Sequence, residues 1–152
     1  MDGKDEITRL YNSRLLKNEE EIEEFENAIE KIVKLQDVKL ISKMCRCFDD
    51  KCENIEVMYG LVHAIEIFEG EEYFEQVIMA TQSMLQTAKM WVRTIYYGIL
   101  NDELSRKIFI DVLKNRVDSN NRLMIISLLE KIRDEKPNIF TGSVNEVINS
   151  II

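Results

Sequence analysis

The scarcity of residues that end or bend regular structure limits the fold of this chain more than any other feature of its sequence. The 152 residues include one proline, Pro137, and five glycines. Strands need frequent tight turns, which are built largely from clusters of glycine, proline, asparagine and aspartate. The chain offers few such signals, so its sequence predicts a fold made almost entirely of helices.

Amphipathic periodicity supports that prediction. Asn18 is a suitable N-cap residue, and three glutamates follow it in a first helical turn, where carboxylates meet the positive end of the helix dipole. Apolar residues then recur at spacings of three and four and form one stripe of Ile22, Phe25, Ile29, Ile32 and Val33. This pattern predicts an amphipathic helix that begins directly after Asn18.

Similar stripes continue along the chain. Asp37 can cap a helix that runs to Phe48, and Asn54 can cap the next helix, which Gly70 closes at its C-terminal end. The inward face of the helix after Asn54 is expected to comprise Ile55, Met58, Leu61, Val62, Ile65 and Phe68. The other helices are expected over residues 6–16, 73–85, 90–100, 104–115, about 119 to Pro137, and 143–151.

The spacing of these helices predicts the architecture. Helical runs that start near residues 54, 70, 88, 101 and 119 place consecutive helix pairs about thirty-odd residues apart, as in two-helix repeats. We therefore predict an all-α fold of antiparallel helical pairs, either a short HEAT-like solenoid or an irregular helical bundle. One domain over residues 1–152 is expected, because a chain of this length and apolar content can bury a continuous core.

The charge is distributed unevenly. Residues 1–75 carry 20 acidic and 10 basic side chains, whereas residues 76–152 carry 8 acidic and 10 basic ones. The acidic half would repel nucleic acid and anionic lipid and would attract a basic protein. The alternative is that these acids only solvate exposed helix faces. The distribution predicts a basic protein partner, and neither a nucleic acid nor a membrane partner.

The cysteines and the N-terminus indicate the compartment. Cys45, Cys47 and Cys52 are an odd number of closely spaced cysteines, which is not a disulfide framework and suits a reducing environment. The first residues carry charges of both signs and precede no unbroken apolar stretch, so no secretory signal or membrane span is expected there. We expect a cytoplasmic protein with free thiols.

Residue sets that could support catalysis or metal binding are sparse. Neither a Gly-x-Ser-x-Gly element nor a glycine-rich phosphate loop occurs. His63 and Glu66 could form half of a metal site, but no second histidine completes it. The three cysteines with His63 could bind zinc, although Cys45 falls on an apolar helix face and Cys47 points away from it. We expect no catalytic residue, no metal and no cofactor, with a metal-dependent enzyme as the competing reading.

An apolar, aromatic helix is expected around Trp91, Tyr96 and Tyr97. These residues share the helix with Met90, Val92, Ile95 and Ile99, which is more apolar surface than one stripe can bury. Either the helix is central and buried on all sides, or part of it forms a contact face on which an exposed tyrosine would be an anchor.

Several segments carry a resemblance to a known family. They are Phe25-Glu-Asn-Ala-Ile29, Cys47-Phe-Asp-Asp50, Glu56-Val-Met-Tyr-Gly-Leu-Val-His-Ala-Ile-Glu66, Trp91-Val with Tyr96, and Ile99-Leu-Asn-Asp-Glu103 with Arg106. Together they resemble the immunity protein 30 family. The resemblance spans about residues 10–117, and Gly98 departs from it where a bulkier or basic residue is expected. It implies a bacterial all-α protein, encoded beside a polymorphic or contact-dependent toxin, that neutralises the C-terminal domain of that toxin.

The expected partner is therefore a toxin domain. Such toxins are often nucleases with basic substrate grooves, which an acidic protein would approach rapidly and inhibit stoichiometrically. The residues predicted to contact the toxin are Asp49, Asp50, Glu66, Glu69, Glu71, Glu72 and Tyr73. The alternative function is a helical-repeat adaptor for another basic protein, since a stable scaffold and a complementary face suit both roles.

Overall fold

The chain is built from helices. In the computed structural model, which describes residues 2–152, the chain forms nine α-helices and one short 3-10 helix, and no strand occurs in that range. This confirms the all-α prediction. The elements, in chain order, are α1 (Lys4–Ser13), α2 (Glu19–Leu35), η1 (Val38–Leu40), α3 (Ile41–Cys45), α4 (Ile55–Glu66), α5 (Glu71–Thr87), α6 (Lys89–Asn101), α7 (Glu103–Asn115), α8 (Ser119–Glu135) and α9 (Pro137–Ile151).

Side-chain caps begin α2, α4, α7 and α8. The Asn18 side chain accepts a hydrogen bond from the backbone N–H of Glu21 (2.9 Å), and Asn54 caps α4 in the same way from Val57 (3.1 Å). Asp102 and Asp118 cap α7 and α8. Backbone and side-chain donors of Asn121 lower the pKa of Asp118, because they stabilise its ionised form. The caps satisfy donors that a helix leaves unpaired in its first turn.

Some helix ends differ from the prediction. The helix after Asp37 is a 3-10 turn followed by the short α3, which ends at Cys45 because Cys47 and Phe48 donate to carbonyls only three residues back. Gly70 does not close α4. The helix stops at Glu66, and Gly70, with a φ of 92°, is instead the N-cap residue of α5. Its φ and ψ lie in a region accessible essentially to glycine alone.

Pro137 both ends α8 and begins α9. Proline has no N–H to donate and has its φ preset for a helix, so it is well suited to a first helical position. The last helix therefore starts at Pro137 rather than at the predicted residue 143.

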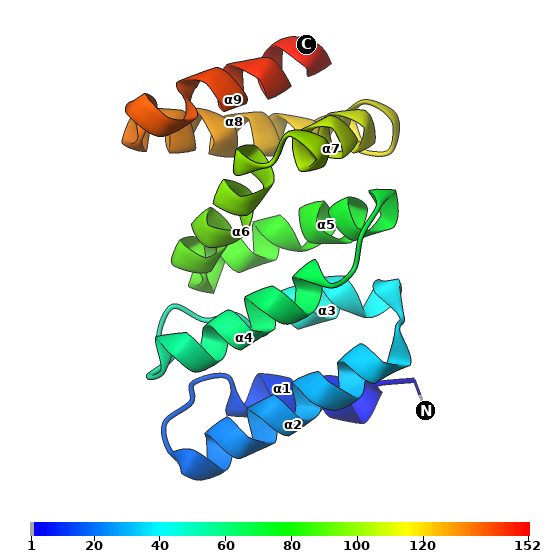
Figure 1. Ribbon diagram of the computed structural model, residues 1–152, viewed down its shortest axis with the longest axis vertical. Coiled ribbons are helices and arrows are strands. Elements are labelled where there is room, and N and C mark those ends of the chain that lie inside the picture. Colours follow the sequence, from blue (N-terminus) through cyan, green and yellow to red (C-terminus); the bar gives the residue numbers. More distant parts are fainter. Residues whose placement is uncertain (1) are drawn as a thin grey trace. The chain divides into compact units, whose positions relative to one another are not determined.

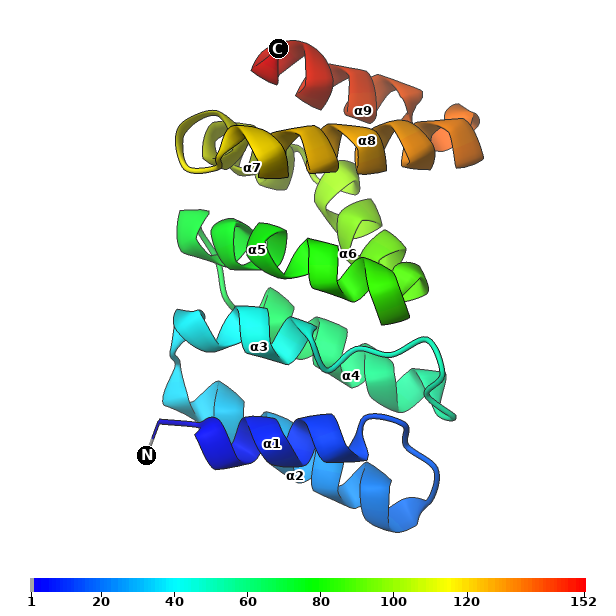
Figure 2. The same ribbon diagram turned by 180° about the vertical axis from the view of Figure 1, so that it is seen from behind.

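The chain divides into two compact units, the first ending at Val92 and the second comprising Arg93–Ile152. In the first unit α1 packs against α2, α2 against α4, and α3 against both α4 and α5. Its core includes Leu10, Phe25, Ile32, Met58, Leu61 and Val77, all fully buried. The short loop between α1 and α2 makes them an antiparallel pair (Figures 1 and 2). One domain over residues 1–152 and a solenoid arrangement stay predictions.

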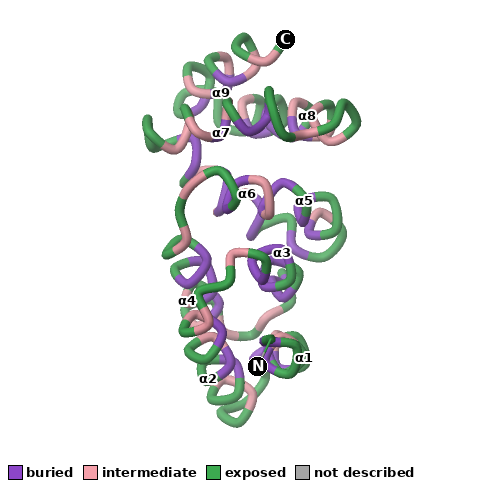
Figure 3. Tube along the Cα trace, turned by 90° about the vertical axis from the view of Figure 1, so that its right-hand side faces the viewer, coloured by how far each residue is buried: buried purple, intermediate pink, exposed green. Residues whose placement is uncertain are grey.

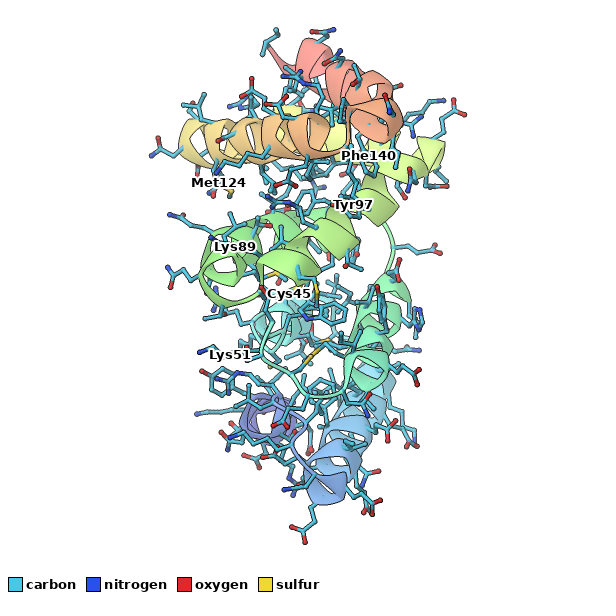
Figure 4. All side chains as sticks on the ribbon, turned by 90° about the vertical axis from the view of Figure 1, so that its left-hand side faces the viewer. Cys45, Lys51, Lys89, Tyr97, Met124 and Phe140 are labelled. Atoms are coloured by element: carbon cyan, nitrogen blue, oxygen red, sulfur yellow. The ribbon has the colours of Figure 1, made fainter. Side chains whose placement is uncertain are left out.

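In the second unit, α9 packs against both α7 and α8. The ring of Tyr97, labelled with Phe140 in Figure 4, stacks on that of Phe140. Their centroids are 4.8 Å apart, and Tyr96 meets Phe109 edge-on at 5.8 Å. Arg93 forms a two-pronged ion pair with Glu135 (3.0 and 3.1 Å). Tyr96 is 1% exposed and Tyr97 is half-buried, which favours the buried reading of this aromatic helix over a contact face.

Replacement of Asn54 by alanine tests the capping of α4. We expect Asn54→Ala to lower the free energy of unfolding by about 1 kcal/mol, because the N–H of Val57 loses its acceptor. Asn27→Ala, at an exposed position inside α2, is the control and should not destabilise the protein, because alanine is the better helix former. Urea denaturation measures both, and equal losses would contradict the capping role.

Candidate partner-binding surface

Asp49, the first of the predicted contact residues, is buried. Its carboxylate forms an ion pair with the Nε of Arg14 at the end of α1 (3.2 Å) and accepts a hydrogen bond from the backbone N–H of Lys51 (2.8 Å). The Asp49 side chain is 7% exposed and that of Arg14 is 23% exposed. A charge this far from water needs such partners, so Asp49 fixes the loop between α3 and α4.

Asp50 is exposed but also makes backbone contacts. Its N–H donates to the carbonyl of Thr87 (2.9 Å), and its carboxylate accepts from the N–H of Met90 (3.1 Å). Met90 lies in the first turn of α6, where a carboxylate meets the positive end of the helix dipole. Asp50 thus ties the loop to the turn between α5 and α6.

Trp91 lies at the centre of the contacts between these segments, which we call the Trp91 junction. Its indole is fully buried, and its Nε1–H donates to the backbone carbonyl of Asp49 (3.2 Å). Phe48 stacks on the indole at 5.8 Å, and Tyr59 of α4 meets it edge-on at 5.0 Å, both distances between ring centroids. The loop before α4, the middle of α4 and the start of α6 therefore converge on one indole.

Exposed acids gather at the other end of α4. Glu66 is the last residue of α4, Glu69 lies in the connecting turn, and Glu71 and Glu72 occupy the first turn of α5, all four exposed. Tyr73, predicted to be an aromatic anchor at the edge of this group, is 6% exposed and packs edge-on against Phe74 at 5.0 Å. The Tyr73 side chain is therefore packed in the interior rather than displayed beside the glutamates.

The seven predicted residues therefore form two groups. The 12-residue α4 separates Asp49 and Asp50 from the four glutamates by about 18 Å at the usual helical rise. Figures 1 and 2 show the two connections at opposite ends of α4. The group at the end of α4, which we call the acidic turn (Glu66, Glu69, Glu71 and Glu72), presents its carboxylates to solvent.

Between the two groups lies an exposed apolar surface that the sequence prediction missed. Ile55 was expected to point inward but is 51% exposed, and Tyr59 and Ile67 are 41% and 64% exposed. His63 lies between them, with its ring 6.5 Å from that of Tyr59. The signal was present in the sequence, because positions 55, 59, 63 and 67 are spaced by four and share one side of a helix.

Two of the three cysteines are packed in the interior. Cys45 and Cys47 are buried, and burial raises the pKa of each thiol to about 12. The expectation that Cys47 points away from the core is wrong, because α3 ends at Cys45 and the tight turn after it carries Cys47 inward. Figure 4 shows Cys45 among the packed side chains. Among residues 2–152, no three His, Cys, Asp or Glu side chains are grouped so that they could hold a metal ion.

No helix in the described part of the chain is both long enough and apolar enough to span a membrane.

Comparison with known protein families gives a match. The family model described as Immunity protein 30 matches residues 12–109, which include α2 to α6, both groups of acids and the exposed side of α4. No curated protein and no solved structure matches the chain.

The ion pair of Asp49 can be tested by truncation. We expect Asp49→Ala to lower the free energy of unfolding by about 2 to 3 kcal/mol, because it leaves the Nε of Arg14 and the N–H of Lys51 without their acceptor. Glu30→Ala is the matched control. It breaks an ion pair with Lys34 of the same 3.2 Å length between side chains that are 66% and 73% exposed. Such a pair contributes less than about 0.5 kcal/mol.

Urea denaturation followed by circular dichroism measures both variants. Similar losses from the two would show that Asp49 is no more important to the fold than a surface carboxylate.

Proposed function

Because this chain belongs to the immunity protein 30 family, we propose that it binds and neutralises the C-terminal domain of a toxin encoded beside it. The match over residues 12–109 is the observation that carries this proposal. The protein acts in the cytoplasm of the producing cell, by stoichiometric binding and without turnover. Each bound toxin domain is thereby withheld from its substrate.

Charge supports a basic toxin. The segment from Cys52 to Ala88, which contains α4 and α5, has seven glutamates and no lysine or arginine. Such a surface attracts a positively charged partner and accelerates its association, and it repels phosphates. A nuclease, whose groove must be basic to hold nucleic acid, is the toxin that this surface suits best.

The acidic turn is the proposed point of first contact. Glu66, Glu69, Glu71 and Glu72 are exposed, close in sequence and held by Gly70 in a turn that only glycine adopts readily. In this proposal Asp49 and Asp50 contribute indirectly, since their carboxylates are engaged in the loop at the other end of α4, and Tyr73 does so because its side chain is buried. The exposed glutamates then steer the toxin and interact with its basic rim.

Co-expression tests the function itself. A catalytically active toxin domain encoded immediately upstream should stop bacterial growth, and this chain expressed with it should restore growth and co-purify with the domain in a 1:1 complex. Failure of the two proteins to bind would overturn the proposed function and leave a helical adaptor for another partner as the better reading.

Neutralisation of charge tests the acidic turn. We expect the triple variant Glu69→Gln, Glu71→Gln and Glu72→Gln to associate with the toxin domain about tenfold more slowly at low salt and to show a weaker salt dependence. The matched control replaces Glu19, Glu20 and Glu23 of α2 by glutamine, which removes the same charge from another exposed helix start. Stopped-flow association rates across a salt series measure both. Equal slowing by the two variants would show that net charge alone, and not the acidic turn, steers the toxin.

A further inference from the structure

The outward side of α4 carries an apolar stripe framed by acids. Ile55, Tyr59 and Ile67 are 51%, 41% and 64% exposed, and His63 completes the spacing of four. We infer that this stripe, which we call the α4 stripe, is the apolar centre of the surface that contacts the toxin, with the acidic turn at its rim. The inference rests on the proposed function and deepens it, because it separates the residues that hold the toxin from those that attract it.

The geometry of α4 places the stripe outside. The opposite side of the helix is occupied by core residues that are at most 5% exposed, namely Met58, Leu61, Val62, Ala64 and Ile65. Figure 3 shows the exposed residues of α4 on the side turned away from α3. Ile55 and Tyr59 of α4, and Ile67, its C-cap residue, are exposed at spacings that place them on one side of the helix, and apolar side chains exposed in this way are typical of protein interfaces.

The centre of the stripe is held in place. The Tyr59 ring lies edge-on to Trp91 at 5.0 Å, and Trp91 is itself buried and hydrogen-bonded to the carbonyl of Asp49. A partly exposed aromatic ring that is already fixed loses little conformational entropy when a partner covers it. Tyrosine in such a position is a frequent energetic hot spot, because it offers a large apolar face together with a hydroxyl.

The negative charge around the α4 stripe determines which kind of partner fits it. Glu56 and Glu66 lie on the same exposed part of α4, the acidic turn follows, and no lysine or arginine occurs from Cys52 to Ala88. A partner that fits must present an apolar depression ringed by lysine or arginine. A second copy of this chain, meeting stripe to stripe across a two-fold axis, would bring like charges together, which disfavours self-association through this face.

The two kinds of residue then have separable roles. Exposed glutamates at the rim act mainly on the association rate, whereas desolvated apolar contacts at the centre act mainly on the dissociation rate. Binding kinetics can separate these two roles. A catalytically inactive form of the toxin domain encoded immediately upstream is immobilised, and the association and dissociation rates of the whole chain are measured on it.

The first comparison removes apolar surface. We expect Ile67→Ala to raise the dissociation constant about tenfold, mostly through faster dissociation. Leu123→Ala is the matched control, because Leu123 on α8 is 65% exposed against 64% for Ile67. The control should bind within about twofold of the unaltered chain.

The second comparison distinguishes electrostatic attraction from apolar contact as the source of the affinity. Ile55→Asp adds a negative charge in the first turn of α4, where an acid suits the helix dipole, so the helix is not weakened. Pure electrostatic attraction would tighten binding of this variant, whereas loss of the apolar contact should weaken it about tenfold or more. Leu104→Asp makes the same change in the first turn of α7 at a residue that is 66% exposed, and it should leave the affinity within about twofold.

Three outcomes would overturn the inference while leaving the function intact. They are unchanged affinity of Ile67→Ala, tighter binding of Ile55→Asp, and equal weakening by the test and control variants. A dimer of the unaltered chain that Ile55→Asp dissociates in sedimentation would assign the stripe to a second copy and overturn it likewise. Absence of binding by the unaltered chain would overturn the proposed function together with the inference.

Discussion

The hydrogen bond from the buried indole of Trp91 to the backbone carbonyl of Asp49 holds together the part of the structure on which the rest depends. A loop of irregular backbone lies between α3 and α4, and its polar groups must be paired. The indole satisfies the carbonyl of Asp49, Arg14 neutralises the Asp49 carboxylate, and the Asp50 carboxylate satisfies the N–H of Met90. Phe48 and Tyr59 enclose the indole. One aromatic side chain thus contacts the loop before α4, α4 itself and, through its own position, the start of α6.

Local physics made much of this fold predictable. The caps Asn18, Asn54 and Asp102 each act on a donor three residues ahead, so the information for the helix start is contained in a few consecutive residues. The prediction that Gly70 closes α4 was wrong for a related reason. A glycine near a helix end suits both a C-terminal cap and a turn into the next helix, and only the packing of α4 and α5 decides between them.

The candidate surface was harder to predict because its residues depend on distant partners. Asp49 and Asp50 look identical in the sequence, yet the first finds Arg14 at a separation of 35 residues and the second finds Met90 at 40. Hydrophobicity likewise does not reveal that Ile55 faces solvent while Met58 faces the core, since both are apolar. The acidic turn was identifiable because charged side chains at a helix end are usually exposed, whereas the α4 stripe required knowledge of which side of the helix the core occupies.

The coexistence of acids and an apolar stripe bears on how such a protein could discriminate between toxins. Negative charge attracts every basic protein and so confers speed rather than selectivity. Selectivity requires contacts that a wrong partner cannot make without leaving groups desolvated and unpaired. Under the proposed function the Tyr59 ring, which is fixed against Trp91, would be such a contact, because a toxin that covers it must supply an apolar surface for the ring and a hydrogen-bond partner for its hydroxyl. Under this proposal, related proteins could keep Trp91 and Tyr59, which pack together, and change residues 55, 63 and 67 to recognise a different toxin. Such changes would leave the core intact, since the residues that fill it lie on the opposite side of α4.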